Sequence, residues 1–90
     1  ETALKVKGES MIDAGINDGD WVIIEESKKF YKSKVHVILI DNQDVTLKYI
    51  EKVNSGEIKL IPANKIYKET IYPVERISIQ GYVVGQVRIY

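Results

Sequence analysis

The sequence predicts an all-β domain built on a curved, partly barrel-like sheet with one short helical turn. The main hydrophobic period is two residues, which is typical of strands. Turn sequences rich in Asp, Asn and Gly recur at short intervals between the apolar segments. The 90 residues contain no repeat, low-complexity tract or internal linker, so we expect residues 1–90 to form a single domain.

Several extended segments follow from this alternation. They are residues 3–7, 21–24, 35–40, 45–52, 57–61, 71–74 and 77–90. Between the first two segments, residues 10–15 fit one helical turn, with Ser10 as its N-cap and Gly15 as its stop. The sequence Asp18-Gly19-Asp20 marks the turn that leads into the second segment.

The central segments predict a hairpin. The strongly apolar residues 35–40 end at a turn over residues 41–44, and residues 45–52 return as the partner strand. Pro62 ends the following segment, because proline cannot donate to a sheet ladder. In the long closing segment, Gly81 and Gly85 are expected at bulges or bends.

Composition excludes several classes of protein. A hydrophobic content of 44% is enough to build a core, and the absence of cysteine excludes disulfides and thiolate metal sites. The absence of cysteine also fits a cytoplasmic protein. The 13 basic and 13 acidic residues cancel, so the chain lacks the positive charge with which nucleic-acid binders neutralise phosphates. No run approaches the roughly 20 apolar residues of a membrane span, and no segment resembles a signal peptide.

Two residues suggest chemistry: Ser10, in the turn that begins at Gly8, and Lys48, in the middle of a strand. Serine needs an adjacent base to become a nucleophile. Lysine is such a base only when neutral, which means lowering its pKa by roughly 3 units, or about 4 kcal/mol of differential desolvation. The period of two places Lys48 on one face with Thr46 and Ile50, where it would be held out of water. Gly8 would allow a close backbone approach, and the N–H groups of the turn would form an oxyanion hole. The alternatives are a serine that only caps a helix and a lysine on a solvated strand face.

Several motifs resemble the LexA-type family, which includes LexA repressors, CI-type phage repressors and UmuD mutagenesis proteins. They are residues 6–11, 16–24, 45–48, 60–64 and 79–85. These motifs have the family's order and spacing over nearly the whole chain. The resemblance implies a LexA C-terminal-domain-like fold whose Ser–Lys dyad cuts its own polypeptide upstream of the serine.

The resemblance also implies roles for particular residues. Ser10 would be the nucleophile and Lys48 the general base, with Met11 lining the site and Gly8 and Glu9 forming the turn around the oxyanion. The main-chain N–H of Ser10 would be an oxyanion donor. No cofactor and no metal are expected.

In repressors of this kind, an N-terminal helix-turn-helix domain binds the operator and the C-terminal domain forms a homodimer. Cleavage, stimulated by the RecA filament, separates the two and lifts repression in SOS or prophage induction. DNA contact would therefore come through an N-terminal domain outside this sequence.

Two departures from the family pattern bear on this expectation. Glu9 stands where many members have aspartate, a change that should leave the turn intact. The family's scissile bond, often Ala-Gly, lies well upstream of the serine, whereas Ala14-Gly15 follows it here. The sequence also begins with Glu1 rather than methionine. We therefore expect a fragment that lacks the cleavage loop and DNA-binding domain of a longer parent.

Three alternatives remain open. A UmuD-like polymerase accessory protein would share the chemistry. A non-cleaving dimerisation or sensing module would keep only the fold. A type I signal peptidase shares Ser-Met and a Ser–Lys dyad, but the lack of a membrane anchor counts against it.

The closing segment suggests a homodimer interface. Its apolar side chains include Tyr82, Val84, Val87 and Ile89, and an exposed apolar strand recruits partners. The alternative is an ordinary internal strand of the sheet.

Other polar residues suggest no metal or nucleic-acid site. The single histidine, His36, is predicted to be a surface strand residue without a metal. The aspartates match no calcium-loop spacing and are interpreted as turn residues: Asp18, Asp20, Asp41 and Asp44. Residues 28–32 mix lysine with Phe30 and Tyr31, but the preceding glutamates favour a solvated loop over a nucleic-acid patch.

Overall fold

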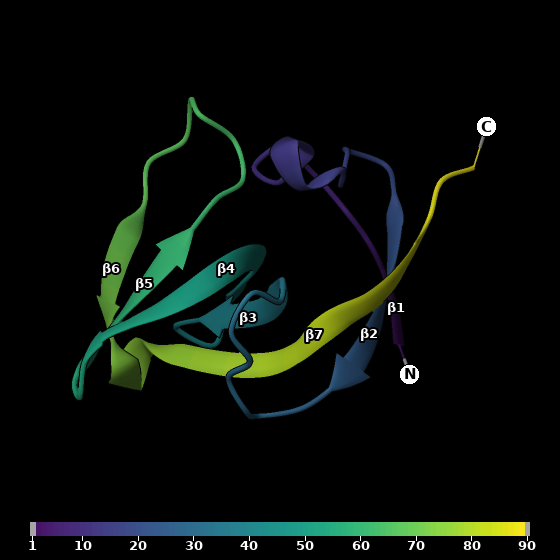
Figure 1. The fold of residues 1–90 in the computed structure, drawn as a ribbon. Helices are drawn as coiled ribbons and strands as arrows, with labels where there is room; N and C mark the ends of the chain where they lie inside the picture. Colours follow the sequence, from purple (N-terminus) through teal and green to yellow (C-terminus); the bar gives the residue numbers. More distant parts are fainter. Residues whose placement is uncertain (1, 90) are drawn as a thin grey trace.

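The computed structural model describes residues 2–89, in which seven strands form one antiparallel sheet. In chain order the strands are β1 (Thr2–Lys5), β2 (Trp21–Glu26), β3 (His36–Ile40), β4 (Asp44–Asn54), β5 (Glu57–Ile61), β6 (Thr70–Pro73) and β7 (Ile77–Val87). Two 3-10 helices, η1 (Ile12–Ala14) and η2 (Val74–Arg76), account for the helical structure of the described residues. The predicted mainly β class is confirmed (Figure 1).

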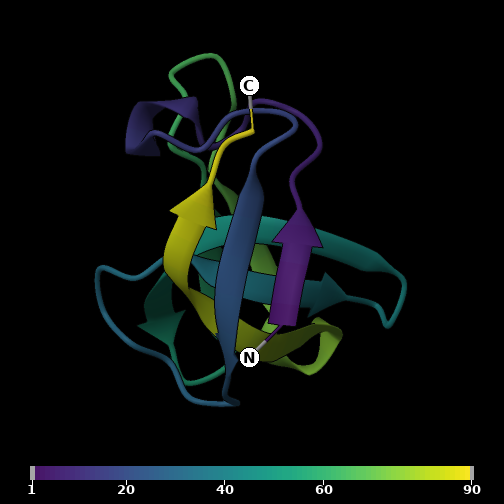
Figure 2. The same cartoon turned by 90° about the vertical axis from the view of Figure 1, so that its right-hand side faces the viewer.

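The sheet is curved but not closed. Its order is β1-β2-β7-β3-β4-β5-β6, which leaves β1 and β6 as the two edges. The long β7 holds the sheet together, because its C-terminal half pairs with β2 and its N-terminal half pairs with β3. Figure 2 shows β2 between β1 and the end of β7. The sheet predicted to be partly barrel-like is therefore curved but does not close into a barrel.

Two irregularities in β7 produce this curvature, and both lie beside the predicted glycines. One shifts the register opposite Ile23/Ile24, next to Gly85, and the other shifts it opposite Val37/Ile38, next to Gly81. A bulge bends its strand and increases the local twist. At Gly81 the neighbouring backbone also approaches so closely that a β-carbon would collide with the Glu25 carbonyl.

The buried apolar residues form two clusters. The first comprises Val6, Met11, Ile16, Val22, Ile24, Val37 and Leu47. The second comprises Ile38, Ile50, Ile58 and Leu60. Neighbouring residues of one strand, such as Val37 and Ile38, belong to different clusters because successive side chains point to opposite sheet faces. Both faces of the central strands are therefore covered.

The helical turn begins later than predicted. η1 starts at Ile12 and its N-cap is Met11, so Ser10 is not the cap residue. Gly15 does end the turn, with a φ of 80° and its N–H donated to the Ile12 carbonyl. The last strand ends at Val87, short of the predicted residue 90, and Tyr90 itself lies outside the described residues.

The prediction that His36 lies on the surface is wrong, because its side chain is fully buried. It belongs to β3, which has β4 on one side and β7 on the other, and the preceding loop folds over it. The Phe30 ring stacks on the imidazole with centroids 5.8 Å apart, and the Tyr31 N–H donates to Nε2 at 3.1 Å. Burial lowers the pKa of His36. The loop is thus only partly solvated.

None of the helical segments within residues 2–89 has the length and apolarity to cross a bilayer.

Candidate functional site

Ser10 and Lys48 meet in the structure although they lie 38 positions apart in the sequence. The Lys48 Nζ donates a hydrogen bond to Ser10 Oγ at 3.2 Å. Lys48 comes from β4, and Ser10 comes from the loop between β1 and η1. A serine hydroxyl in contact with an amine has the geometry required of a nucleophile and its base.

The surroundings of Lys48 favour its neutral form. Burial lowers the pKa of Lys48, since desolvation disfavours the charged amine. No carboxylate within residues 2–89 forms an ion pair with Nζ to counter this. The Thr46 Oγ1 accepts a second hydrogen bond from Nζ at 2.5 Å. The period of two already placed Thr46 on this face, but sequence reasoning gave it no role.

The turn before Ser10 is held by the loop that leads into β2. The Gly8 N–H donates to Asp18 Oδ1 at 2.7 Å, and the Val6 N–H donates to the Asp20 carbonyl at 2.8 Å. Gly8 has a φ of 87°, a left-handed value that favours glycine. The expected close backbone approach at Gly8 is wrong, because no neighbouring atom lies within 4 Å of where its β-carbon would stand.

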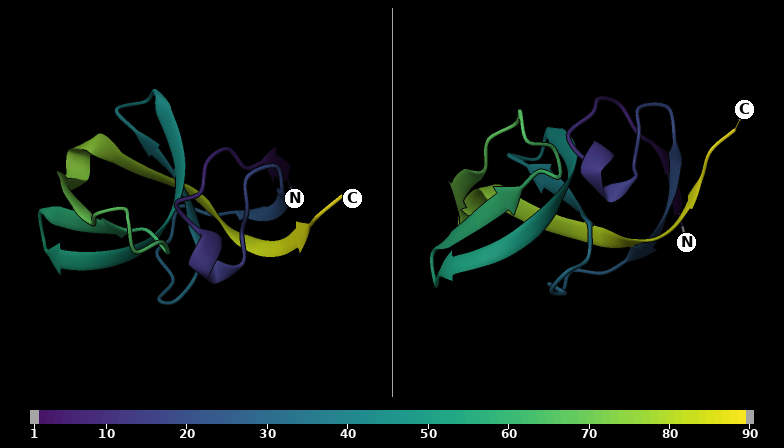
Figure 3. Two further views of the ribbon diagram at one scale, coloured as in Figure 1. Left: turned by 90° about the horizontal axis from the view of Figure 1, so that it is seen from above. Right: turned by 45° about the horizontal axis from the view of Figure 1, so that its top comes forward.

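The segment after β5 holds the other side of the same turn. The Ala63 N–H donates to the Ser10 carbonyl at 2.8 Å, and the Asp13 N–H donates to the Ala63 carbonyl at 2.7 Å. Asn64 donates from Nδ2 to the Glu9 carbonyl at 2.7 Å. Figure 3 shows the η1 segment beside the loop between β5 and β6. The Leu-Ile-Pro-Ala-Asn motif, to which sequence reasoning had assigned no role, runs from the end of β5 into this segment.

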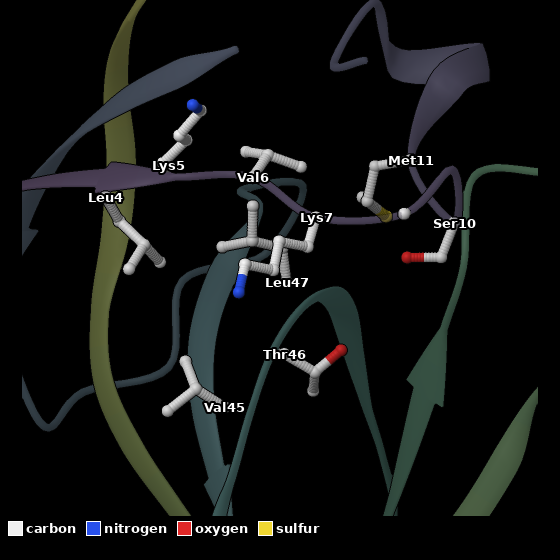
Figure 4. Close-up of a pocket in the computed structure, with 10 residues that line it drawn as sticks. Leu4, Lys5, Val6, Lys7, Ser10, Met11, Val45, Thr46 and Leu47 are labelled. Atoms are coloured by element: carbon white, nitrogen blue, oxygen red, sulfur yellow. The ribbon is translucent and has the colours of Figure 1, made fainter. Parts of the chain in front are cut away.

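A pocket of about 270 Å³ opens next to Ser10. It is lined by Leu4, Lys5, Val6, Lys7, Gly8, Ser10, Met11, Val45, Thr46 and Leu47. Figure 4 shows the side chains of β1, the serine turn and the start of β4 around it. Met11 belongs to the lining, although most of its side chain is buried in the first cluster. Glu9 is exposed and does not line the pocket.

A buried carboxylate ties the end of β7 to this loop. Asp20 is only 2% exposed, and Arg88 donates to both of its oxygens, from Nε at 2.9 Å and from Nη2 at 3.0 Å. Gln86 donates from Nε2 to Asp20 Oδ2 at 2.8 Å and to the Gly15 carbonyl at 2.7 Å. The Arg88 contact, with the Asn17 N–H, holds the pKa of Asp20 far below its usual range. Sequence reasoning treated Asp20 only as a turn residue.

Replacing Asp20 with asparagine should lower the stability of the domain at neutral pH. It should also make that stability depend less on pH in acid. A carboxyl whose pKa is lowered by folding stabilises the fold above its unfolded pKa of about 4. That contribution is lost as the pH falls further, since the unfolded chain then binds the proton more readily. The difference between the wild-type and Asp20→Asn melting temperatures should therefore be largest at pH 7 and begin to shrink below about pH 4. It should persist at pH 3, because the folded carboxyl is still ionised there. Asp13→Asn, at an exposed carboxylate of η1, is the control; equal effects of the two changes would contradict the prediction.

The residues predicted for a dimer interface separate into two groups. Val84 and Val87 are each 47% exposed and Ile89 is 76% exposed, so these three apolar side chains near the C-terminal end of the described chain are accessible to a partner. Tyr82 instead contacts its own chain, with its ring 4.8 Å from that of Tyr31 and beneath the Lys34 amine.

Asp41, interpreted above as a turn residue, has a structural partner. Asp41 forms an ion pair with Arg76, which lowers the pKa of its carboxyl. No cluster of three or more His, Cys, Asp or Glu side chains within residues 2–89 is arranged to hold a metal ion.

Comparison with known proteins agrees with the resemblance described above. The model of the family described as Peptidase S24-like matches residues 1–84. The LexA repressor of Zymomonas mobilis is 44% identical over 88 residues, covering 98% of this chain and 40% of the relative. The LexA repressor of Gluconacetobacter diazotrophicus is 48% identical over 98% of this chain and 34% of its own length. The chain thus spans about two fifths or less of the curated relatives compared here.

Proposed function

This chain belongs to the S24-like peptidase family and is related to LexA repressors, and on that basis we propose that it is the C-terminal domain of a LexA-type repressor that cuts its own polypeptide with Ser10 and Lys48. The observation that supports this most directly is the 3.2 Å contact between the Lys48 amine and the Ser10 hydroxyl, in surroundings that lower the pKa of the lysine.

The proposed reaction begins with neutral Lys48. Its amine takes the proton from Ser10 Oγ as that oxygen attacks the carbonyl carbon of the scissile peptide. The oxyanion that forms accepts a hydrogen bond from the Ser10 N–H. The Lys48 ammonium then gives its proton to the departing amine, which leaves an ester on Ser10. Lys48 next activates a water molecule, which hydrolyses the ester and restores the serine.

The proposed substrate is an extended segment of the same polypeptide, N-terminal to this sequence. Its apolar side chains would occupy the pocket beside Ser10, whose walls include Leu4 and Val45. The Ala14-Gly15 bond is not the substrate, because hydrogen bonds of η1 hold it in the loop that carries the nucleophile.

Homodimerisation through Val84, Val87 and Ile89 is the proposed second activity. The exposure of these three apolar side chains supports it, since exposed apolar surface favours association. The parent would bind operator DNA with its N-terminal part, and a RecA filament would stimulate cleavage. The alternatives within the same family are a UmuD-like accessory protein and a regulator that dimerises without cleaving.

The test is self-cleavage of the full-length parent at raised pH, followed by mass spectrometry of the products. We expect one cut upstream of residue 1 in the wild type and none in Ser10→Ala. Ser55→Ala, in an exposed turn, is the matched control and should cleave normally. A wild-type parent that stays intact, with or without activated RecA, would support the non-cleaving regulator instead.

A further inference from the structure

The peptide groups on both sides of Ser10 have their carbonyls fixed by the segment after β5. The Glu9 carbonyl accepts from Asn64 Nδ2 at 2.7 Å, and the Ser10 carbonyl accepts from the Ala63 N–H at 2.8 Å. Asn64 is 9% exposed, and its Oδ1 accepts from the Ile66 N–H at 3.2 Å. Because both ends of the amide are used, its orientation is determined.

These contacts also determine where the neighbouring N–H groups point. A trans peptide is planar, so its N–H points away from the direction of its C=O. The Glu9 carbonyl and the Ser10 N–H belong to one peptide group, so the Ser10 N–H points away from Asn64. The Ser10 carbonyl and the Met11 N–H are related in the same way. Neither N–H donates to an acceptor within residues 2–89. Two adjacent donors are therefore free beside the proposed nucleophile.

We infer that Asn64 is a positioning residue that holds the Ser10 N–H ready for the oxyanion. This inference rests on the proposed self-cleavage. By donating to the Glu9 carbonyl, the Asn64 side chain keeps the peptide group between Glu9 and Ser10 from rotating. The same hydrogen bond polarises that peptide group, which makes the Ser10 N–H a stronger hydrogen-bond donor. Asn64 does not line the pocket and contacts neither Ser10 Oγ nor Lys48, so it acts through the backbone.

The sharpest variant is Asn64→Asp in the full-length parent. Aspartate keeps the size and the acceptor for the Ile66 N–H but has no donor for the Glu9 carbonyl. Asn64→Ala removes both contacts and serves as the second variant. We expect Asn64→Asp to slow cleavage by about tenfold or more, given that loss of a whole oxyanion donor costs about 10²–10³-fold. The pH at which the rate is half-maximal should not move, because Lys48 is untouched.

Binding measurements on the wild type and on Asn64→Asp distinguish a positioning role from general damage to the site. A peptide boronate forms a tetrahedral adduct on the serine and places an oxygen where the oxyanion forms, whereas an uncleaved peptide of the same sequence does not. In Asn64→Asp, affinity for the boronate should fall by the same factor as the rate, and affinity for the peptide should stay constant.

Wild-type rates in Asn64→Asp, or equal losses of boronate and peptide affinity, would overturn the inference. A wild-type parent that neither cleaves nor binds the boronate would overturn the proposed function as well, so the two failures are distinguishable.

Discussion

Self-cleavage of the full-length parent should fall by at least about 10²–10⁴-fold when Lys48 is replaced by alanine, the range contributed by a positioned general base. The reason is that Ser10 then has no group to accept its proton, since its hydroxyl contacts the Lys48 amine. Lys52→Ala, four residues further along β4 at an exposed position, is the matched control and should leave the rate unchanged.

The pH dependence of cleavage tests the role of Lys48 as a base. The rate should follow the neutral fraction of the amine, so it should rise with pH through the Lys48 pKa and level off above it. Because burial lowers that pKa, the rise should come at a lower pH than for an exposed lysine. Lys48→Arg should be inactive at every pH, since a guanidinium stays charged. An active Lys48→Arg, or a rate independent of pH, would contradict the assignment.

Gly81→Ala should destabilise the domain by about 1–3 kcal/mol or more, the usual cost of overpacking a well-packed interior. A β-carbon there would collide with the Glu25 carbonyl and would lie 2.7 Å from Ile24 Cγ2. The obstructing carbonyl belongs to the backbone of β2, so relief requires the β2–β7 ladder to shift. Each kcal/mol corresponds to about 4–8 °C in melting temperature for a domain of this size.

Gly85→Ala is the control for this effect. It lies on the same strand, but its β-carbon would meet only Ile23 side-chain atoms at 3.5 Å or more, an ordinary contact. Thermal or urea denaturation of the two variants should therefore show a large loss for Gly81→Ala and a small one for Gly85→Ala. Similar losses would mean that strand flexibility, rather than the close approach, determines the need for glycine.

The sequence was sufficient to predict the class of fold and most of its strands. The period of two identified the hairpin of β3 and β4 with small errors at the ends, because alternation depends only on near neighbours. Gly15 and the glycines of β7 were also predicted, since a left-handed turn and a bulge leave a local signature. The family resemblance rested on local motifs, and the comparisons confirm it.

Only the tertiary structure decided which polar groups meet. Nothing in the spacing showed that Asn64 contacts the Glu9 carbonyl, or that Arg88 contacts Asp20, because these partners lie 55 and 68 positions apart. His36 looked like a surface residue because alternation gives a residue's face but not what covers that face, which here is the loop carrying Phe30. Periodicity is a property of neighbouring residues, whereas burial and hydrogen bonding depend on distant segments that the curvature of the sheet brings together.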